Sequence, residues 1–282
     1  MRKYYILIAL LAASLFSVYS QDIDVKKSDA IMEEGLQNYS KAAQLYEEAA
    51  KGYEQNGVFD TTCWYRAGVC NLKLKEYQKA LTIFTKIEAN NIVTGDLMLS
   101  MGDTYYGLKQ MDKSEKYLLK AIEVDSQVAF DSYKKLVLVS YNSRQFGKAV
   151  EYADDALAID STDTQTMYIK TLSLEQQGKI DDAVISCEKL LEVKPNYSKG
   201  IEKMGLLYAQ QVDDKYDREK KRYEAMKSPT RMDWHNSTKK LEAIGQEYKK
   251  AIPYLEKTLA KNPNNEVVKK TLDTAKSRMK IQ

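Results

Sequence analysis

The side chains that most often carry out chemistry in proteins are few in this sequence and do not gather into a recognised set. The 282 residues contain one histidine, His235, with one carboxylate, Asp233, two positions before it. A zinc site needs three or four ligands, so this pair does not make one. The sequence also lacks a glycine-rich phosphate loop and the signatures H-E-x-x-H, G-x-S-x-G and paired C-x-x-C. We therefore expect a protein that is not an enzyme and that binds no metal ion and no cofactor.

The three cysteines are expected to be free thiols. Cys63 and Cys70 are seven residues apart on one expected helix, which separates their Cα atoms by about 10 Å. A disulfide cannot bridge that distance without breaking the helix. Together with Cys187, they are better suited to act as small buried apolar side chains.

The elements that position these residues are expected to be helices. The sequence has only four prolines and 12 glycines, and 29% of its residues are charged. Few helix breakers combined with many charges is typical of an all-helical chain. The net charge is only +3, from 43 basic and 40 acidic residues, which argues against a nucleic-acid-binding protein.

One sequence pattern recurs along the chain at steps of about 34 residues. A bulky residue is followed three positions later by a small one, and four positions after that comes another bulky or small residue. The small residues are Ala42, Ala80, Ser114, Ala149 and Ala183. Small residues also stand twelve positions before three of them, at Ala30, Gly68 and Gly102. Such pairs of small residues allow two helices to cross closely.

This pattern resembles the tetratricopeptide repeat, a helix–turn–helix unit. The resemblance extends over nearly all of residues 24–264 and is strongest in the second and third units. The residues that match the repeat signature are Trp64, Ala67, Gly68, Ala80, Phe84, Met101, Gly102, Tyr105, Ala121 and Pro195. It implies an all-α fold: a helix–turn–helix repeat superhelix, or α-solenoid, of about six units. One such helix pair cannot bury its apolar face alone, so neighbouring pairs must stack.

Ten helices are expected in the first five units. Their ranges are 24–37, 40–55, 61–74, 77–88, 96–108, 112–124, 129–143, 146–159, 163–177 and 180–193. Each carries apolar residues three and four positions apart, which gives it one apolar face.

The last unit is interrupted by an insertion of 34 residues. Gly205 fits the first helix of this unit, but the alanine of its second helix appears at Ala251 instead of near position 217. Apolar residues at helical spacing on both sides of Pro229 predict a long helical hairpin at about 215–247. Asn236 or Ser237 is expected to cap its second helix, and Pro253 is expected to kink it. Residues 21–264 thus form the array, and 265–282 form a capping helix.

In the tetratricopeptide family, partners commonly lie along a concave face lined by first helices, and the resemblance implies such a face here. The repeat register predicts that this concave face carries Tyr65, Arg66, Val69, Asp103, Tyr106, Lys134, Leu138, Tyr168 and Leu172. Aromatic and charged side chains of this kind suit an extended peptide or a partner helix. The alternative is that several of them pack between helices. The Lys/Asn clamp of the chaperone-binding members is absent.

The hairpin turn offers a second candidate surface. Arg231 and Trp234 stand close together there, and exposed Trp and Arg are enriched in binding surfaces. The alternative is that Trp234 packs across the turn. Charge is also uneven: residues 199–282 have 20 basic and 12 acidic side chains. This excess suits an acidic partner, although a solvated helical projection also favours Lys and Arg.

Residues 1–20 have the features of a signal peptide. A short basic head precedes the apolar stretch of residues 6–18, and Val18 and Ser20 are small residues suited to cleavage before Gln21. Thirteen helical residues reach only about 20 Å, which is short of a bilayer core of about 30 Å. An uncleaved anchor is the alternative. We expect an exported protein that is periplasmic or associated with the cell envelope, with no transmembrane span after cleavage.

Two functions are compatible with these observations. The first is a non-enzymatic scaffold or adaptor that binds a protein or peptide through the concave face, the hairpin, or both. The second is a structural module whose basic C-terminal part associates with an acidic membrane surface or a polysaccharide. An enzyme is a third class, which the missing catalytic set argues against.

Overall fold

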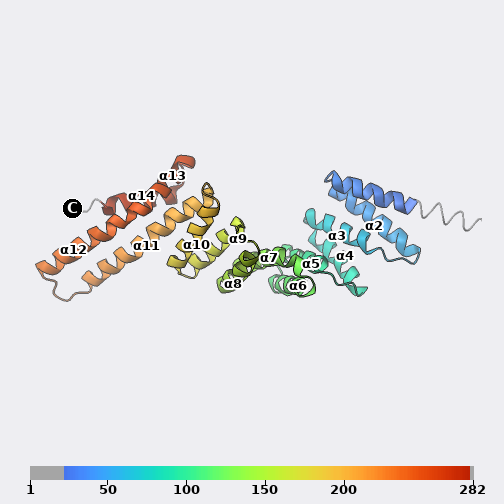
Figure 1. Cartoon of the computed structure of the whole chain (residues 1–282), viewed down its shortest axis with the longest axis horizontal. Coiled ribbons are helices and arrows are strands. Elements are labelled where there is room, and N and C mark those ends of the chain that lie inside the picture. Colours follow the sequence, from blue (N-terminus) through green and yellow to red (C-terminus); the bar gives the residue numbers. More distant parts are fainter. Residues whose placement is uncertain (1–21, 280–282) are drawn as a thin grey trace, which may run out of the picture. The chain divides into compact units, whose positions relative to one another are not determined.

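The computed structural model describes residues 22–279, and the expected signal peptide lies outside them. Every regular element of the described chain is helical (Figure 1). The chain divides into two compact units on either side of the Val139–Ser140 peptide bond. The all-helical fold predicted from the sequence is confirmed.

The first unit contains a helix over residues 22–35 and the elements that follow it, as far as the beginning of α7. These elements are α2 (Tyr39–Gln55), α3 (Thr61–Lys73), α4 (Tyr77–Ala89), α5 (Gly95–Gly107), α6 (Met111–Val124), the short 3₁₀ helix η1 (Ser126–Val128) and α7 (Ala129–Asn142).

The second unit contains the end of α7 and the remaining elements. These are α8 (Phe146–Ile159), α9 (Thr164–Gln176), α10 (Ile180–Val193), α11 (Ser198–Glu224), α12 (Arg231–Gly245), the 3₁₀ helix η2 (Gln246–Lys250), α13 (Ile252–Lys261) and α14 (Glu266–Met279). The ten helices predicted up to residue 193 begin and end within about two residues of the observed ones.

Side-chain caps fix the start of several first helices. The side chains of Asp60, Thr94 and Asp163 accept hydrogen bonds from the backbone N–H groups three residues later, at 2.7, 3.2 and 2.8 Å. Each such bond satisfies a donor that the first turn of a helix leaves without a partner. Helices α3, α5 and α9 therefore begin where the sequence places an acceptor.

In the first five repeats, the turns between the two helices share one backbone geometry. In each, a single residue has a positive φ, and the next N–H donates to the carbonyl five residues earlier, as Glu76 does to Asn71 at 2.9 Å. This is the Schellman arrangement, which satisfies carbonyls at a helix end. The positive-φ residues are Gln37, Lys75, Lys109, Arg144 and Gly178.

Glycines allow the two helices of one repeat to approach closely. A Cβ atom on Gly68 would lie 2.3 Å from the Phe84 ring, and one on Gly102 would lie 2.6 Å from the Leu118 side chain. These distances are too short for any real Cβ atom. The glycines therefore allow the bulky side chain of the second helix to rest directly on the backbone of the first.

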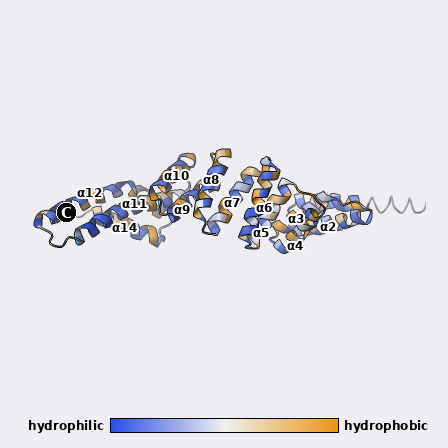
Figure 2. Ribbon diagram, turned by 90° about the horizontal axis from the view of Figure 1, so that it is seen from below, coloured by the Kyte–Doolittle hydropathy of each residue, from blue (hydrophilic) through white to orange (hydrophobic). Residues whose placement is uncertain are grey.

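Helices α11 and α12 form the long hairpin predicted within the last unit (Figure 1). Their antiparallel pairing is fixed by Glu219, whose carboxylate accepts from Ser237 at 3.1 Å and pairs with Lys240 at 2.7 Å. Most of the hairpin ribbon is hydrophilic (Figure 2). The long helix after the turn is interrupted rather than only kinked, because η2 separates α12 from α13, in which Pro253 occupies the first turn.

The cap predicted for the second hairpin helix was wrong. Neither Asn236 nor Ser237 begins α12. Instead, Thr230 caps it through a capping box, in which the Thr230 hydroxyl accepts from the Asp233 N–H at 3.2 Å and Asp233 accepts from the Thr230 N–H at 2.9 Å. The reciprocal bonds of a capping box satisfy two donors together, which favours a start at Arg231. Trp234 and His235 therefore lie on a helix and not in the turn.

Candidate partner-binding site

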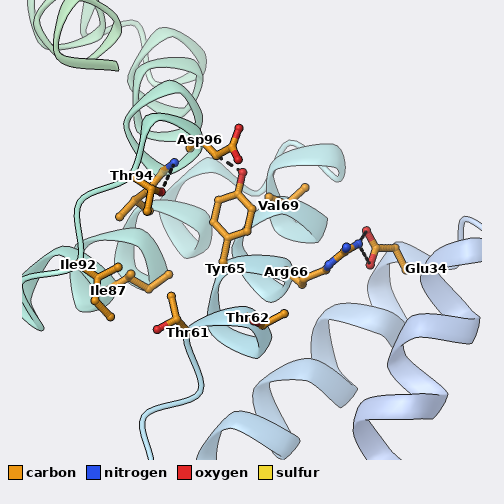
Figure 3. Close-up of a pocket in the computed structure, with 11 residues that line it drawn as sticks. Glu34, Thr61, Thr62, Tyr65, Arg66, Val69, Ile87, Ile92, Thr94 and Asp96 are labelled. Atoms are coloured by element: carbon orange, nitrogen blue, oxygen red, sulfur yellow. Dashed lines mark hydrogen bonds and ion pairs between the residues drawn. The ribbon is translucent and has the colours of Figure 1, made fainter. Parts of the chain in front are cut away.

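A pocket of about 440 Å³ opens on the first unit, and three of the predicted partner-binding residues line it (Figure 3). We call it the Tyr65 pocket. Its walls come from the helix over residues 22–35, from α3 and α4, from the loop before α5 and from the first turn of α5. The lining residues are Glu34, Thr61, Thr62, Tyr65, Arg66, Val69, Ile87, Ile92, Thr94, Asp96 and Leu97.

Tyr65 stands at the centre of the pocket wall. Its ring packs on Phe84, with the ring centroids 6.0 Å apart. Its hydroxyl lies 3.1 Å from the hydroxyl of Ser100 and 3.5 Å from the Asp96 carbonyl oxygen. Burial raises the pKa of the phenol. Its ring contact and its hydroxyl contacts thus hold Tyr65 in place beside Arg66, with the hydroxyl directed toward Asp96, as Figure 3 shows.

Arg66 lies beside Tyr65 and is partly committed to an ion pair. One guanidinium nitrogen donates to both carboxylate oxygens of Glu34, at 3.1 and 3.0 Å. Glu34 is itself held by the Tyr46 hydroxyl, at 2.7 Å. The pair raises the pKa of Arg66. Half of the Arg66 side chain stays exposed, and its other nitrogens have no partner among residues 22–279. It can therefore donate to a carboxylate or carbonyl of a bound molecule.

The floor of the pocket is apolar and the rim is polar. Ile87 and Leu97 are buried beneath it, and Val69 and Ile92 are half-buried. A pocket of this kind, with an apolar floor and a few fixed polar groups, suits a single apolar side chain held in one orientation.

The other residues predicted for the concave face of the first unit lie outside the pocket. Asp103 is paired with Lys135 at 3.0 Å, and burial raises its pKa. The Tyr106 ring lies 5.7 Å from the Lys109 ammonium, and Lys134 lies 4.8 Å from the Phe130 ring. Leu138 is half-buried.

The predicted residues of the second unit belong to two separate places. Tyr168 is half-buried and stands edge-on to Tyr197, with 5.7 Å between ring centroids, and Leu172 near it is also half-buried. Arg231 and Trp234 occupy the first turn of α12 and are exposed. Trp234 keeps 55% of its surface exposed and so is not packed across the hairpin turn.

Several residues of the pocket were not predicted. Glu34 comes from the preceding helix, Ile92 and Thr94 come from the loop before α5, and Asp96 comes from the first turn of α5. One sequence signal could have found Glu34: a carboxylate stands 32 residues before a cation in four ion pairs of this unit. These pairs are Glu34–Arg66, Glu54–Lys86, Glu88–Lys120 and Asp103–Lys135.

No cluster of three or more His, Cys, Asp or Glu side chains suited to a metal ion occurs within residues 22–279. Within the same residues, no helix is both long enough and apolar enough to cross a membrane. The three cysteines are buried and free.

Comparison with known sequences finds the tetratricopeptide repeat family. Two profiles described as tetratricopeptide repeat match residues 33–91 and 95–128. The protein named "Protein STIP1 homolog" from Dictyostelium discoideum is 33% identical over 86 residues. That match covers 27% of this chain and only 15% of the relative.

Solved structures share the fold. YrrB, titled a TPR protein with an unusual peptide-binding site, has a TM-score of 0.58 at 15% identity, covering 82% of this chain and 99% of YrrB. The C-terminal part of a TPR repeat-containing protein from Cytophaga hutchinsonii has a TM-score of 0.60 at 18% identity, covering 87% and 99%. MamA has a TM-score of 0.56 at 18% identity, covering 63% and 94%. Residues 33–91 and 95–128 thus match tetratricopeptide repeats, and the described chain as a whole has the all-helical repeat fold of these structures.

Proposed function

We propose that this chain is a non-enzymatic adaptor that binds another protein by seating an apolar side chain of an extended segment in the Tyr65 pocket. Tetratricopeptide repeats typically mediate protein–protein interaction, and the family is typically non-enzymatic. The observation that carries the proposal is the combination of an apolar floor, a fixed aromatic wall and an arginine with free donors.

The pocket also favours an extended segment over a rigid globular face. Exposed Thr62, Thr94 and Asp96 stand around the rim, where their oxygens can bond to backbone groups of a bound chain. An extended segment offers such groups at every residue and places alternate side chains on one side. One apolar side chain can then enter while the backbone stays on the rim.

A displayed random-peptide library, panned on the full chain from Gln21 onward, tests the proposal. Val69→Lys places a charge in the pocket floor and should abolish binding of the recovered peptides. Val124→Lys is the matched control, because Val124 is exposed on the same unit and does not line the pocket. Peptides that bind both variants equally well would contradict the proposal.

Two substitutions at Tyr65 sharpen the test. The aromatic ring forms the pocket wall, whereas the hydroxyl is occupied by Ser100 and Asp96. Tyr65→Phe should keep the affinity of a recovered peptide within about threefold, and Tyr65→Ala should lower it by about tenfold or more. Equal losses in the two variants would show that the ring is not a contact surface.

We also propose that the protein is exported and acts in the periplasm or cell envelope. The basic head and apolar stretch of residues 1–20 support this location. Expression of the full sequence in a bacterium, followed by fractionation and N-terminal sequencing, should yield a periplasmic chain that begins at Gln21. A cytoplasmic chain that retains residues 1–20 would refute the proposal.

A further inference from the structure

The end of the α11–α12 hairpin carries exposed apolar side chains that the fold does not use. We define the hairpin tip as residues 218–240, which contain the last turns of α11, the connection and the first turns of α12. Met232 is 65% exposed and Trp234 is 55% exposed. A large aromatic side chain left in water at the far end of a hairpin makes no contribution to a core.

The other tryptophan shows what a structural tryptophan looks like in this protein. Trp64 is buried, and its indole N–H donates to Glu54 at 3.0 Å. The ammonium of Lys86 lies 3.7 Å from its ring. The Trp234 indole has no hydrogen bond and no ring or cation contact with any residue of the described chain, and only its backbone N–H donates, to the Thr230 carbonyl oxygen. The two tryptophans therefore differ in kind: Trp64 is part of the fold, and Trp234 is presented to the outside.

The hairpin tip is strongly basic. It has eight basic and three acidic residues. All three acidic side chains already have partners. Glu219 forms ion pairs with Arg222 and Lys240, and Glu224 forms one with Lys220. Asp233 accepts a hydrogen bond from the Thr230 N–H in the capping box. Five exposed cations of the hairpin tip form no ion pair with a carboxylate within residues 22–279. They are Arg218, Lys221, Lys227, Arg231 and Lys239.

We propose that the hairpin tip is an interfacial anchor that binds the surface of an anionic lipid bilayer. Trp234 and Met232 would enter the boundary between headgroups and acyl chains, where amphipathic aromatic rings are favoured. The five cations without a carboxylate partner would face the anionic headgroups. The inference does not depend on the Tyr65 pocket, which lies in the other unit.

The arrangement favours a lipid surface over an acidic protein. Met232 and Trp234 project singly from one helical turn, and neither lines the two pockets formed by α11 with its neighbours, which are lined by residues such as Arg218. A protein partner requires a matched concave or flat surface with a packed centre. A fluid bilayer requires only apolar side chains surrounded by positive charge, and this is what the hairpin tip offers.

Vesicle binding with tryptophan emission as the readout tests the proposal. The full chain from Gln21 onward is mixed with vesicles of phosphatidylcholine, with or without about one third phosphatidylserine, at low and high salt. We expect binding only to the anionic vesicles, weakened by salt. We also expect a blue shift of tryptophan emission that is absent in Trp234→Phe. Binding without a shift from Trp234 would overturn the proposal, as would no binding at low salt.

A pair of matched triple variants separates the hairpin tip from net charge. The variant K221Q/K227Q/K239Q should lower affinity for anionic vesicles by about tenfold or more. The control K257Q/K269Q/K270Q removes the same charge from exposed positions on α13 and α14 and should stay close to the parent. Equal losses in the two variants would overturn the proposal. Capture on soluble polyglutamate without vesicle binding would also overturn it, in favour of an acidic protein partner.

Discussion

Leu255 packs so closely on Gly205 that a Cβ atom at position 205 would lie 2.9 Å from the Leu255 Cδ2 atom, although fifty residues separate the two. In earlier repeats the same contact joins residues only sixteen apart: Phe84 packs on Gly68, and Leu118 packs on Gly102. The difference of 34 residues is the length of the predicted insertion. The hairpin thus enters between two helices that still pack as a normal repeat.

These glycine contacts predict a stability loss on substitution. Gly68→Ala and Gly205→Ala should each lower the free energy of unfolding by about 1–3 kcal/mol, because the added methyl group overpacks the helix crossing. Urea unfolding followed by circular dichroism measures the change. Gly35→Ala in the first unit and Gly147→Ala in the second are controls, since nothing lies within 4 Å of either position. A neutral result at both contact glycines would contradict the repeat register.

The turns between the two helices of each unit predict opposite effects at two positions. Lys75 has φ 61° and Gly178 has φ 73° at equivalent places, and residues other than glycine are strained there. Lys75→Gly should raise the free energy of unfolding by about 0.5–1 kcal/mol, whereas Gly178→Ala should lower it by about 1 kcal/mol. Lys75→Ala keeps the strain and is the control. Stabilisation by alanine as large as by glycine would show that the lysine side chain, and not its φ, is unfavourable.

The buried carboxylate of Glu219 predicts a pH-dependent hairpin. Hydrogen bonds from Arg222 hold its pKa at about 2, below the ordinary 4.5. A depressed pKa stabilises the folded state above pH 4.5, and this contribution is lost as the pH falls toward 2. Glu219→Gln should therefore cost about 1–3 kcal/mol at pH 7 and much less near pH 2.5, in paired urea titrations. A cost that does not change with pH would refute the assignment.

The cysteines predict slow thiol chemistry in the folded protein. Burial raises the pKa of Cys63 and Cys187 to about 12 and that of Cys70 to about 11. The reactive thiolate is therefore scarce at pH 8, and the sulfur atoms are shielded from reagent. A disulfide-exchange reagent should modify the native chain at least about a hundredfold more slowly than the chain in guanidinium chloride, where three thiols should react. Rapid reaction of one thiol would show local opening around it.

The sequence was informative about the fold because each unit repeats the same packing requirement. Ala80 with Gly68, and Ser114 with Gly102, mark a close helix crossing, and a small residue is the only solution there. Helix ends followed from the same register. The start of α12 was predicted wrongly because Asn236 or Ser237 was preferred as the cap. Thr230 and Asp233 have the spacing of a capping box, which is the better signal.

The site was less accessible from sequence than the fold. Register placed Tyr65, Arg66 and Val69 on one exposed helix face, and they line one pocket. The remaining walls depend on the distances between consecutive repeats, which the periodicity of the sequence does not predict. Glu34 reaches Arg66 only because consecutive first helices stack with a particular offset. Asp96 lies in the first turn of α5, which the loop after α4 brings close to Tyr65.

The hairpin insertion also determines the order in which the last repeat folds. Closing a chain over fifty residues instead of sixteen costs about 1 kcal/mol more loop entropy if the intervening residues are unstructured. Contacts within the hairpin, such as that between Glu219 and Ser237, span only eighteen residues and form without this cost. We expect α11 and α12 to pair first and so bring Leu255 back to Gly205. The slower step in closing this end of the protein is then the packing of Leu255 on Gly205, which the formed hairpin makes less costly.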